Sequence, residues 1–171
     1  AELSGFLRES DGTQTPNRMN NKQIKFGVIG MGHIGKRHAT MIMRQKGAKL
    51  VAVADIRPAG ETGWTEGEAA YFDSAEALLA SDLALDVVVV ATPNGFHEEH
   101  AMAVLEAHKH VVIEKPMALT KAGCERIIYK SLQVSKQVFC VMQNRYSPPS
   151  VWIKEVLDQK LMGNIHLVEI N

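Results

Sequence analysis

Short apolar runs alternate with longer segments of helical period through most of this chain. The runs that predict strands lie at residues 25–29, 50–54, 70–72 (the weakest), 87–91, 111–114 and 138–142. Residues 87–90 are four valines, and a strand that is apolar on both faces is typical of a parallel sheet with helices packed above and below it. Such alternation indicates β-α-β units, so we expect an α/β fold with a doubly wound, Rossmann-like parallel sheet.

The segments between these strands carry signals for helix ends. The expected helices span residues 33–46, 74–80, 95–107 and 121–134. Asp73, three residues before Glu76, is a suitable N-terminal cap, and so are Asn94 and Thr120. Gly47 follows the first helix, and we expect it to adopt the left-handed conformation that often ends a helix.

Both ends of the chain differ from this alternating middle. Residues 1–21 lack a sustained apolar period, which predicts a flexible tail, and Met19 is a candidate start that would make residues 1–18 a tag. The Ser-Pro-Pro-Ser sequence at 147–150 interrupts helix and strand. We therefore expect a dinucleotide-binding domain at 22–146. Residues 147–171, with a helix at 151–161 and a strand at 165–170, are expected to be the incomplete start of a C-terminal α+β domain for substrate binding and oligomerisation.

Composition and charge narrow the partners and the compartment. The 171 residues include 19 Lys+Arg and 19 Asp+Glu, so the formal net charge is zero and we expect neither nucleic acid nor membrane as a partner. No apolar run approaches the roughly 20 residues that a membrane helix needs. Cys124 and Cys140 have neither metal-binding nor disulfide-framework spacing, so we expect a cytoplasmic protein with reduced thiols and no metal site.

The strongest chemical signal is a G-x-G-x-x-G sequence between a predicted strand and a predicted helix. Its first glycine permits a tight turn, its second lets the backbone approach a pyrophosphate, and its third lets the helix lie close to the strand. Free N–H groups at the helix N-terminus would bind the pyrophosphate. A glycine-rich turn without ligand is the alternative. The expected cofactor-binding residues are Gly30, Met31, Gly32, His33, Ile34 and Gly35.

Asp55 follows the second predicted strand, 55 − 35 = 20 residues beyond the last glycine of this fingerprint. At that spacing a carboxylate binds the adenosine ribose hydroxyls, which favours NAD over NADP. Arg57 offers a counter-charge for a 2′-phosphate, so it belongs to the candidate cofactor site and keeps NADP open as the less favoured cofactor. A simple turn residue at the strand end is the alternative for Asp55.

Two more polar sequences follow the fourth and fifth predicted strands. Because the carboxyl ends of parallel strands meet at one edge of the sheet, both should border the nicotinamide end of the cleft. Other roles stay open on the residues alone: a helix cap for Asn94, a surface position for His97 and a solvated ion pair for the Glu-Lys sequence. The candidate cofactor-binding residues here are Thr92, Pro93, Asn94, His97, Glu114 and Lys115.

In this order and spacing, the fingerprint, Asp55, Thr-Pro-Asn-x-x-His and Glu-Lys-Pro resemble the Gfo/Idh/MocA (glucose-fructose oxidoreductase / inositol dehydrogenase) family of NAD(P)-dependent oxidoreductases. The resemblance covers about residues 22–171. It implies that Lys115 is catalytic and lies between nicotinamide and substrate, and that the peptide bond before Pro116 is cis. It also implies cofactor-side positions for Asn94, His97 and Glu114.

The segment at 143–149 is similar to that of family members acting at C3 of UDP-N-acetyl-glucosaminuronic acid. In such an enzyme Arg145, like Lys115, would bind the substrate, here through an anionic group. A domain-linker ion pair is the alternative for Arg145. The resemblance further implies a homo-oligomer formed through a complete C-terminal domain, and a second catalytic pair that residues 1–171 do not supply.

We therefore expect an NAD-dependent oxidoreductase that transfers a hydride between a ring carbinol of a sugar or sugar nucleotide and nicotinamide, with Lys115 accepting the hydroxyl proton. One alternative is a non-catalytic NAD-binding module or sensor with the same fold. Another is a reductase of an imine or enal. Substrate and reaction direction stay open.

Two sequences suggest ligand sets that we set aside. The histidines of His97-Glu98-Glu99-His100 are three residues apart, whereas the zinc motif H-E-x-x-H needs a separation of four. Met41 and Met43 are expected to fill the core on the first helix rather than to bind a ligand.

Overall fold

The computed structural model describes residues 23–65 and 67–169. Within them lies a six-stranded sheet in the order β3-β2-β1-β4-β5-β6, in which every neighbouring pair of strands is parallel. The expected parallel sheet and its six strands are confirmed. Between β1 and β4 the strand order reverses, which creates the switch point where doubly wound sheets bind ligands. The strands are β1 (Ile24–Ile29), β2 (Ala48–Ala54), β3 (Ala70–Phe72), β4 (Val87–Val90), β5 (His110–Ile113) and β6 (Val138–Cys140).

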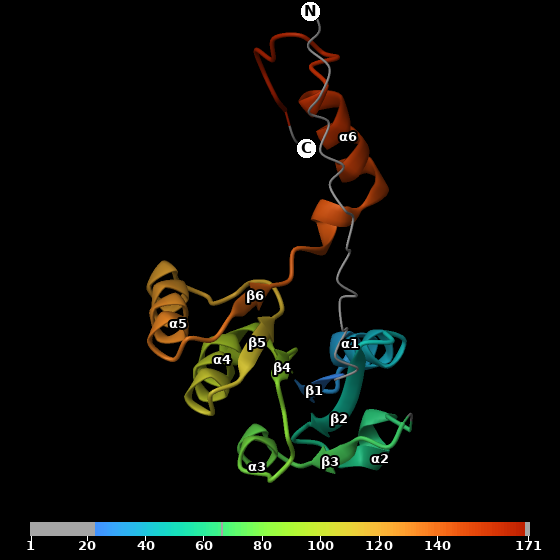
Figure 1. The fold of residues 1–171 in the computed structure, drawn as a ribbon, viewed down its shortest axis with the longest axis vertical. Coiled ribbons are helices and arrows are strands. Elements are labelled where there is room, and N and C mark those ends of the chain that lie inside the picture. Colours follow the sequence, from blue (N-terminus) through green and yellow to red (C-terminus); the bar gives the residue numbers. More distant parts are fainter. Residues whose placement is uncertain (1–22, 66, 170–171) are drawn as a thin grey trace, which may run out of the picture.

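Helices connect the strands and cover both faces of the sheet (Figure 1). The α-helices are α1 (His33–Met43), α2 (Ala59–Thr62), α3 (Ala75–Leu79), α4 (His97–Glu106), α5 (Lys121–Gln133) and α6 (Pro148–Asp158), and the 3₁₀ helices are η1 (Asn94–Phe96) and η2 (Gln143–Tyr146).

An apolar cluster lies on each face of the sheet. Along β4, Val88 and Val90 pack with residues of α3, α4 and α5, whereas Val89 packs with residues of α1. This explains why four consecutive valines form the strand, since both of its faces are buried. Full burial of such a side chain stabilises the fold by about 1.5–3 kcal/mol relative to exposure.

The hydrogen bonds at two helix N-termini confirm one expected cap and correct the other. Thr120 caps α5 as expected, because its Oγ1 accepts from the Gly123 N–H at 3.0 Å. The cap of α3 is Ser74 rather than Asp73: Ser74 Oγ accepts from the Ala77 N–H at 3.1 Å. A cap bonds to the N–H three residues on, and helix α3 begins too late for Asp73 to do so.

Asn94 and Gly47 do not have the roles expected of them. Asn94 lies inside the 3₁₀ turn η1, so its side chain does not cap α4. Helix α1 ends at Met43 on a right-handed Arg44, and Gly47 is not among the glycines with positive φ. Tight turns, including one from the Gln45 N–H to the Ile42 carbonyl, redirect the chain before Gly47 is reached.

The methionines of α1 are more exposed than expected. Met41 and Met43 are 48% and 38% exposed, whereas Ile42 between them is 8% exposed. Successive helical residues are about 100° apart, so a helix that buries Ile42 turns both neighbours away from the sheet.

Beyond β6 the chain leaves the sheet through η2, and α6 stands apart from the sheet (Figure 1). This helix starts at Pro148 rather than at residue 151, because proline is well suited to the first turn of a helix. Residues 165–169 form no strand, contrary to expectation, since a strand needs a ladder partner and they have none among the described residues.

The expected tail at 1–21 lies entirely outside the described residues, and the division into domains stays a prediction. None of the helices in the described part combines the length and apolarity required to cross a membrane.

Candidate functional site

A cavity of about 490 Å³ opens at the carboxyl ends of β1, β2 and β4, at the switch point of the sheet. Three turns line it: the glycine fingerprint, the Asp55–Arg57 turn and the turn at 91–96. The sequence therefore placed its first three candidate segments correctly around one cleft. Of the residues expected there, the lining includes Gly30, Gly32, His33, Ile34, Asp55, Arg57, Thr92 and Pro93.

The three fingerprint glycines are required for different reasons. Gly30 has a φ of 92°, and a Cβ on it would lie 2.7 Å from the Ala91 carbonyl oxygen. A Cβ on Gly35 would collide with the Gly30 carbonyl oxygen. Gly32 differs, because a Cβ there would have no protein atom within 4 Å and would project into open space beside the cavity. The fold thus accounts for two of the glycines, and the third leaves room for a ligand.

The N-terminus of α1 faces this open space without a protein group to satisfy it. Gly32 is the cap residue, no side chain caps the helix, and its first turn contains no acidic residue. The first N–H groups of a helix have no intrahelical acceptor and lie at the positive end of its dipole. His33 and Ile34 are exposed there, whereas the Met31 side chain is fully buried in the core. The residues present therefore fit a diphosphate at residues 32–35.

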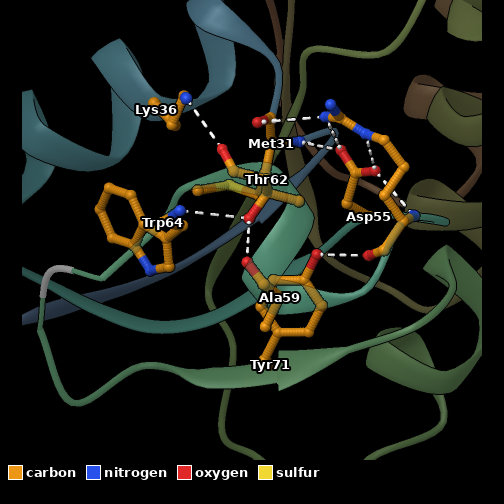
Figure 2. Close-up of polar contacts among 8 residues, drawn as sticks. Met31, Lys36, Asp55, Ala59, Thr62, Trp64 and Tyr71 are labelled. Atoms are coloured by element: carbon orange, nitrogen blue, oxygen red, sulfur yellow. Dashed lines mark hydrogen bonds and ion pairs between the residues drawn. The ribbon is translucent and has the colours of Figure 1, made fainter.

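Asp55 is held in a dense set of hydrogen bonds (Figure 2). Its Oδ2 accepts from the Met31 N–H at 2.7 Å and from Arg57 Nη2 at 3.0 Å, while its Oδ1 accepts from the Arg57 N–H at 2.9 Å and Nε at 3.0 Å. A carboxylate has about four acceptor positions, so these bonds occupy all of them. A ribose hydroxyl that binds Asp55 must therefore replace a bond from Arg57, whose side chain is 45% exposed.

The same contacts determine the charge of Asp55. Its burial by itself would raise the pKa of the carboxyl, but the hydrogen bonds from Arg57 and Met31, together with the Arg57 charge, hold the pKa below its ordinary value. Asp55 is consequently an anion at neutral pH, which opposes a 2′-phosphate and suits a ribose diol.

A polar network braces this wall of the cleft from behind (Figure 2). The Tyr71 hydroxyl donates to the Arg57 carbonyl at 2.8 Å, Lys36 Nζ donates to the Thr62 carbonyl at 2.9 Å, and Thr62 Oγ1 accepts from the Trp64 N–H at 3.2 Å. The first bond joins β3 to the turn that carries Asp55, and the second joins α1 to α2. These hydrogen bonds hold the wall of the cleft at Asp55 and Arg57 in place.

Phe96 and His100 also line the cleft, although the sequence did not identify them. His100 Nδ1 lies 3.0 Å from Thr92 Oγ1, and the Phe96 and His100 ring centroids are 5.9 Å apart. Burial lowers the pKa of His100, against the raising effect of nearby acids such as Glu99, so the ring is neutral at neutral pH. The only sequence signal was their separation of four residues after a strand end, which places two side chains on one helical face.

His97 is close to the cleft but does not border it. It is 1% exposed, with Nδ1 2.7 Å from the Pro116 carbonyl oxygen and Nε2 2.8 Å from the Thr92 carbonyl oxygen. Asn94 is exposed and is also absent from the lining. His97 thus joins the turn that contains Thr92 to the turn that contains Pro116. Within the described residues, no group of three or more His, Cys, Asp or Glu is arranged to hold a metal.

Glu114 and Lys115 follow β5 and point toward different neighbours. Glu114 Oε1 lies 2.7 Å from His38 Nε2 of α1, and its Oε2 accepts from the Lys115 N–H at 3.2 Å. The peptide bond between Lys115 and Pro116 is cis, as the resemblance implied.

The exposed Lys115 side chain lines a second cavity of about 470 Å³, formed mainly by η2 and α6. Arg145, the other expected substrate residue, lines the same cavity, and so does Lys154. The structure therefore brings the two candidate substrate residues together, with a third cation and no acidic residue in the lining. Lys154 is also paired with Asp158 at 2.7 Å.

Comparison with known proteins agrees with this architecture. The sequence profile of the Gfo/Idh/MocA family, described as an oxidoreductase family with an NAD-binding Rossmann fold, matches residues 24–142. The inositol 2-dehydrogenase/D-chiro-inositol 3-dehydrogenase of Halalkalibacterium halodurans is 34% identical over 145 residues, which cover 82% of this chain and 41% of that protein. The D-glucoside 3-dehydrogenase of Escherichia coli is 29% identical over 152 residues, covering 87% of this chain and 43% of that protein.

A similar structure is the WlbA dehydrogenase from Bordetella pertussis, solved in complex with NADH and UDP-GlcNAcA. Its TM-score is 0.77 at 33% sequence identity, and the match covers 85% of this chain and 45% of the WlbA chain. The present chain thus spans less than half the length of each of these three proteins.

Proposed function

This chain belongs to the Gfo/Idh/MocA family of oxidoreductases, and from that membership we propose that it is the nucleotide-binding part of an NAD-dependent sugar or sugar-nucleotide dehydrogenase. The position of Lys115 carries the proposal. Its side chain lines the second cavity, while the next residue, Pro116, is bridged through His97 to Thr92 in the wall of the nucleotide cleft. Lys115 is therefore within the reach of a substrate that meets the cofactor between the two cavities.

The residues around the cleft suit NAD in three places. Residues 32–35 would hold the diphosphate at the N-terminus of α1, the anionic Asp55 would bind the adenosine ribose, and Thr92 and Pro93 would border the nicotinamide. Bound NAD supplies the acceptor for a hydride. Since Asp55 is ionised, we expect NADP to bind less tightly than NAD.

Lys115 would take part in the proton transfer. Oxidation of a ring carbinol removes a hydride from carbon and a proton from the hydroxyl, and leaves a carbonyl group. Bound NAD would take up the hydride. Lys115 Nζ, as the unprotonated amine, would accept the hydroxyl proton and pass it on to solvent, to which this side chain is exposed. In the reverse direction the same ammonium donates the proton.

An anionic sugar nucleotide is the substrate class that the second cavity supports best. Lys115, Arg145 and Lys154 line it, and a guanidinium can bind a carboxylate or phosphate through two parallel hydrogen bonds. The complex of the WlbA relative with UDP-GlcNAcA supports the same class. We propose that groups outside the present chain complete the substrate site, since the matched residues make up only 41% and 45% of these two relatives.

Turnover tests the proposal. The full-length protein is assayed with NAD against UDP-sugar uronates, free sugars and inositols, and Lys115→Met is compared with wild type. We expect oxidation of a uronate-type substrate, and a loss of about 10²-fold or more in kcat for Lys115→Met with unchanged affinity for NADH. Equal rates would refute the role of Lys115, and NADH binding without turnover of any of these substrates would indicate a non-catalytic module.

A further inference from the structure

Each residue that flanks Lys115 is held by a histidine from a different helix. His38 of α1 contacts the Glu114 side chain at 2.7 Å, and His97 of α4 contacts the Pro116 carbonyl at 2.7 Å. We propose that His38 and His97 are positioning residues that fix the backbone on both sides of Lys115 and so place its ammonium group for proton transfer. The inference rests on the proposed function of Lys115.

His38 acts through the carboxylate of Glu114. The two side chains are 24% and 13% exposed, so water has limited access to their contact. The second carboxylate oxygen, Oε2, accepts from the Lys115 N–H at 3.2 Å. Glu114 therefore connects the imidazole of His38 to the backbone of Lys115, and an ionised acceptor makes such hydrogen bonds stronger than neutral ones.

This contact also relates the two parts of the site. His38 lies on α1, the helix whose N-terminus faces the nucleotide cleft, three residues after the last fingerprint glycine. A helix is stiff over so short a distance. The element that would bind the diphosphate is thus also the element that holds the turn carrying Lys115.

His97 restrains the other side of the turn. The ring lies between the carbonyl oxygens of Pro116 and Thr92, at 2.7 and 2.8 Å, and is 1% exposed. A neutral imidazole donates to one of these oxygens and an imidazolium donates to both. In either form the ring fills the space between the two turns and keeps the Lys115 turn in register with the nicotinamide side of the cleft.

The exposed Lys115 side chain needs such support because its own stem is flexible. No hydrogen bond from its ammonium restrains it within the described residues, so the position of Nζ depends on how firmly the backbone is held. Displacing a catalytic group by about 1 Å costs as much as roughly 10²-fold in rate. Loss of either histidine should consequently reduce the rate of the chemical step more than it reduces cofactor binding.

Amide hydrogen exchange measured by NMR on the 171-residue protein tests the positioning directly. In His38→Ala we expect the Lys115 amide to exchange at least about tenfold faster, with β1 and β4 amides unchanged. His38→Gln, whose side-chain amide can still donate to Glu114, should restore protection. His108→Asn, an exposed histidine just after α4, is the matched control and should change neither region. An unchanged Lys115 amide in His38→Ala, or uniform acceleration throughout the sheet, would overturn the inference.

Kinetics of the full-length enzyme separate this inference from the proposed function. His38→Ala and His97→Gln should lower kcat by about tenfold or more while the KM for NAD stays within about twofold, and His38→Gln should recover part of kcat. If Lys115→Met has no effect, the proposed function fails. If Lys115→Met is inactive while both histidine variants keep normal kcat, the positioning role fails and the proposed function stands.

Discussion

Gly32 and Gly35 lie three residues apart in one turn, yet the fold constrains only one of them. A Cβ on Gly35 would meet the carbonyl oxygen of Gly30, which is backbone and cannot move aside. A Cβ on Gly32 would meet no protein atom, at a φ of −68° that any residue adopts. Gly35 is thus required by the fold, whereas we infer that Gly32 is required by a ligand in the cleft.

Alanine substitutions should separate these two roles. Gly32→Ala should change the free energy of unfolding by no more than about 0.5 kcal/mol relative to wild type. Alanine is a slightly poorer helix cap than glycine, but it also makes the unfolded chain less flexible, and the two effects oppose each other. It should weaken NADH binding at least about tenfold, equivalent to about 1.4 kcal/mol. Gly35→Ala should instead destabilise the protein by about 1–3 kcal/mol through overpacking. Urea unfolding measures the stability of each variant, and fluorescence titration measures its affinity for NADH. Destabilisation by Gly32→Ala, together with a stable Gly35→Ala, would contradict these roles.

Asp55 should make stability depend on acid pH. A carboxyl whose pKa is lowered in the folded state contributes stability above its ordinary pKa of about 4, and loses that contribution as the pH falls through the folded value. Asp55→Asn should therefore be less stable than wild type at pH 7, by about 1–3 kcal/mol for the lost charged acceptor. The difference in the free energy of unfolding between Asp55→Asn and wild type should become smaller below about pH 4, where the Asp55 carboxylate of wild type begins to be protonated.

Urea unfolding between pH 3 and pH 7 checks this behaviour. The exposed Asp82→Asn serves as the control and should track wild type throughout. A gap between Asp55→Asn and wild type that stays constant to pH 3 would mean that the Arg57 and Met31 bonds do not stabilise the ionised carboxylate.

The sequence identified half of the residues that line the cleft, because glycines and a strand-end acid at this fixed spacing are typical of dinucleotide sites. It did not reveal where His97 would point, since a side chain at a strand-to-helix turn can face the cleft or the interior with the same spacing. His38 was missed for a related reason: its partner Glu114 is 76 residues away in sequence. Contacts of this kind depend on the strand order, which local patterns do not contain.

Helices and strands were predictable to different degrees. The strands follow from burial, because runs such as residues 87–90 are apolar on both faces and only a covered parallel strand satisfies them. Helix ends depend on one or two hydrogen bonds, and several residues near an end can supply them. The sequence predicted Asp73 as the cap of α3, whereas the structure has Ser74 in that position.

The cap of α5 offers a clean test at this level. Thr120→Ala removes the acceptor for the Gly123 N–H and should lower the free energy of unfolding by about 1 kcal/mol. Thr120→Ser keeps the hydroxyl and should stay close to wild type. Chemical denaturation of the three proteins decides the question, and a fully stable Thr120→Ala would show that the helix does not depend on this cap.

Taken together, the elements form two cavities, and Lys115 lines the second of them. The first lies at the switch point of the sheet, where we propose that a dinucleotide binds, and the lining of the second includes three cationic side chains. The strand at 165–170 that the sequence predicted needs neighbours that the described residues lack, so its apolar alternation alone was a misleading signal. The nucleotide cleft, by contrast, is formed entirely by segments within residues 29–100.

NMR titration of the ¹⁵N-labelled protein with NADH is the measurement that tests the central claim most directly. We predict saturable shifts of the amides at residues 30–35, 55–57 and 91–96, the three turns that line the nucleotide cleft. The amides of α5, remote from that cavity, should remain unshifted. An absence of shifts at millimolar NADH, or shifts concentrated on α5, would contradict the account.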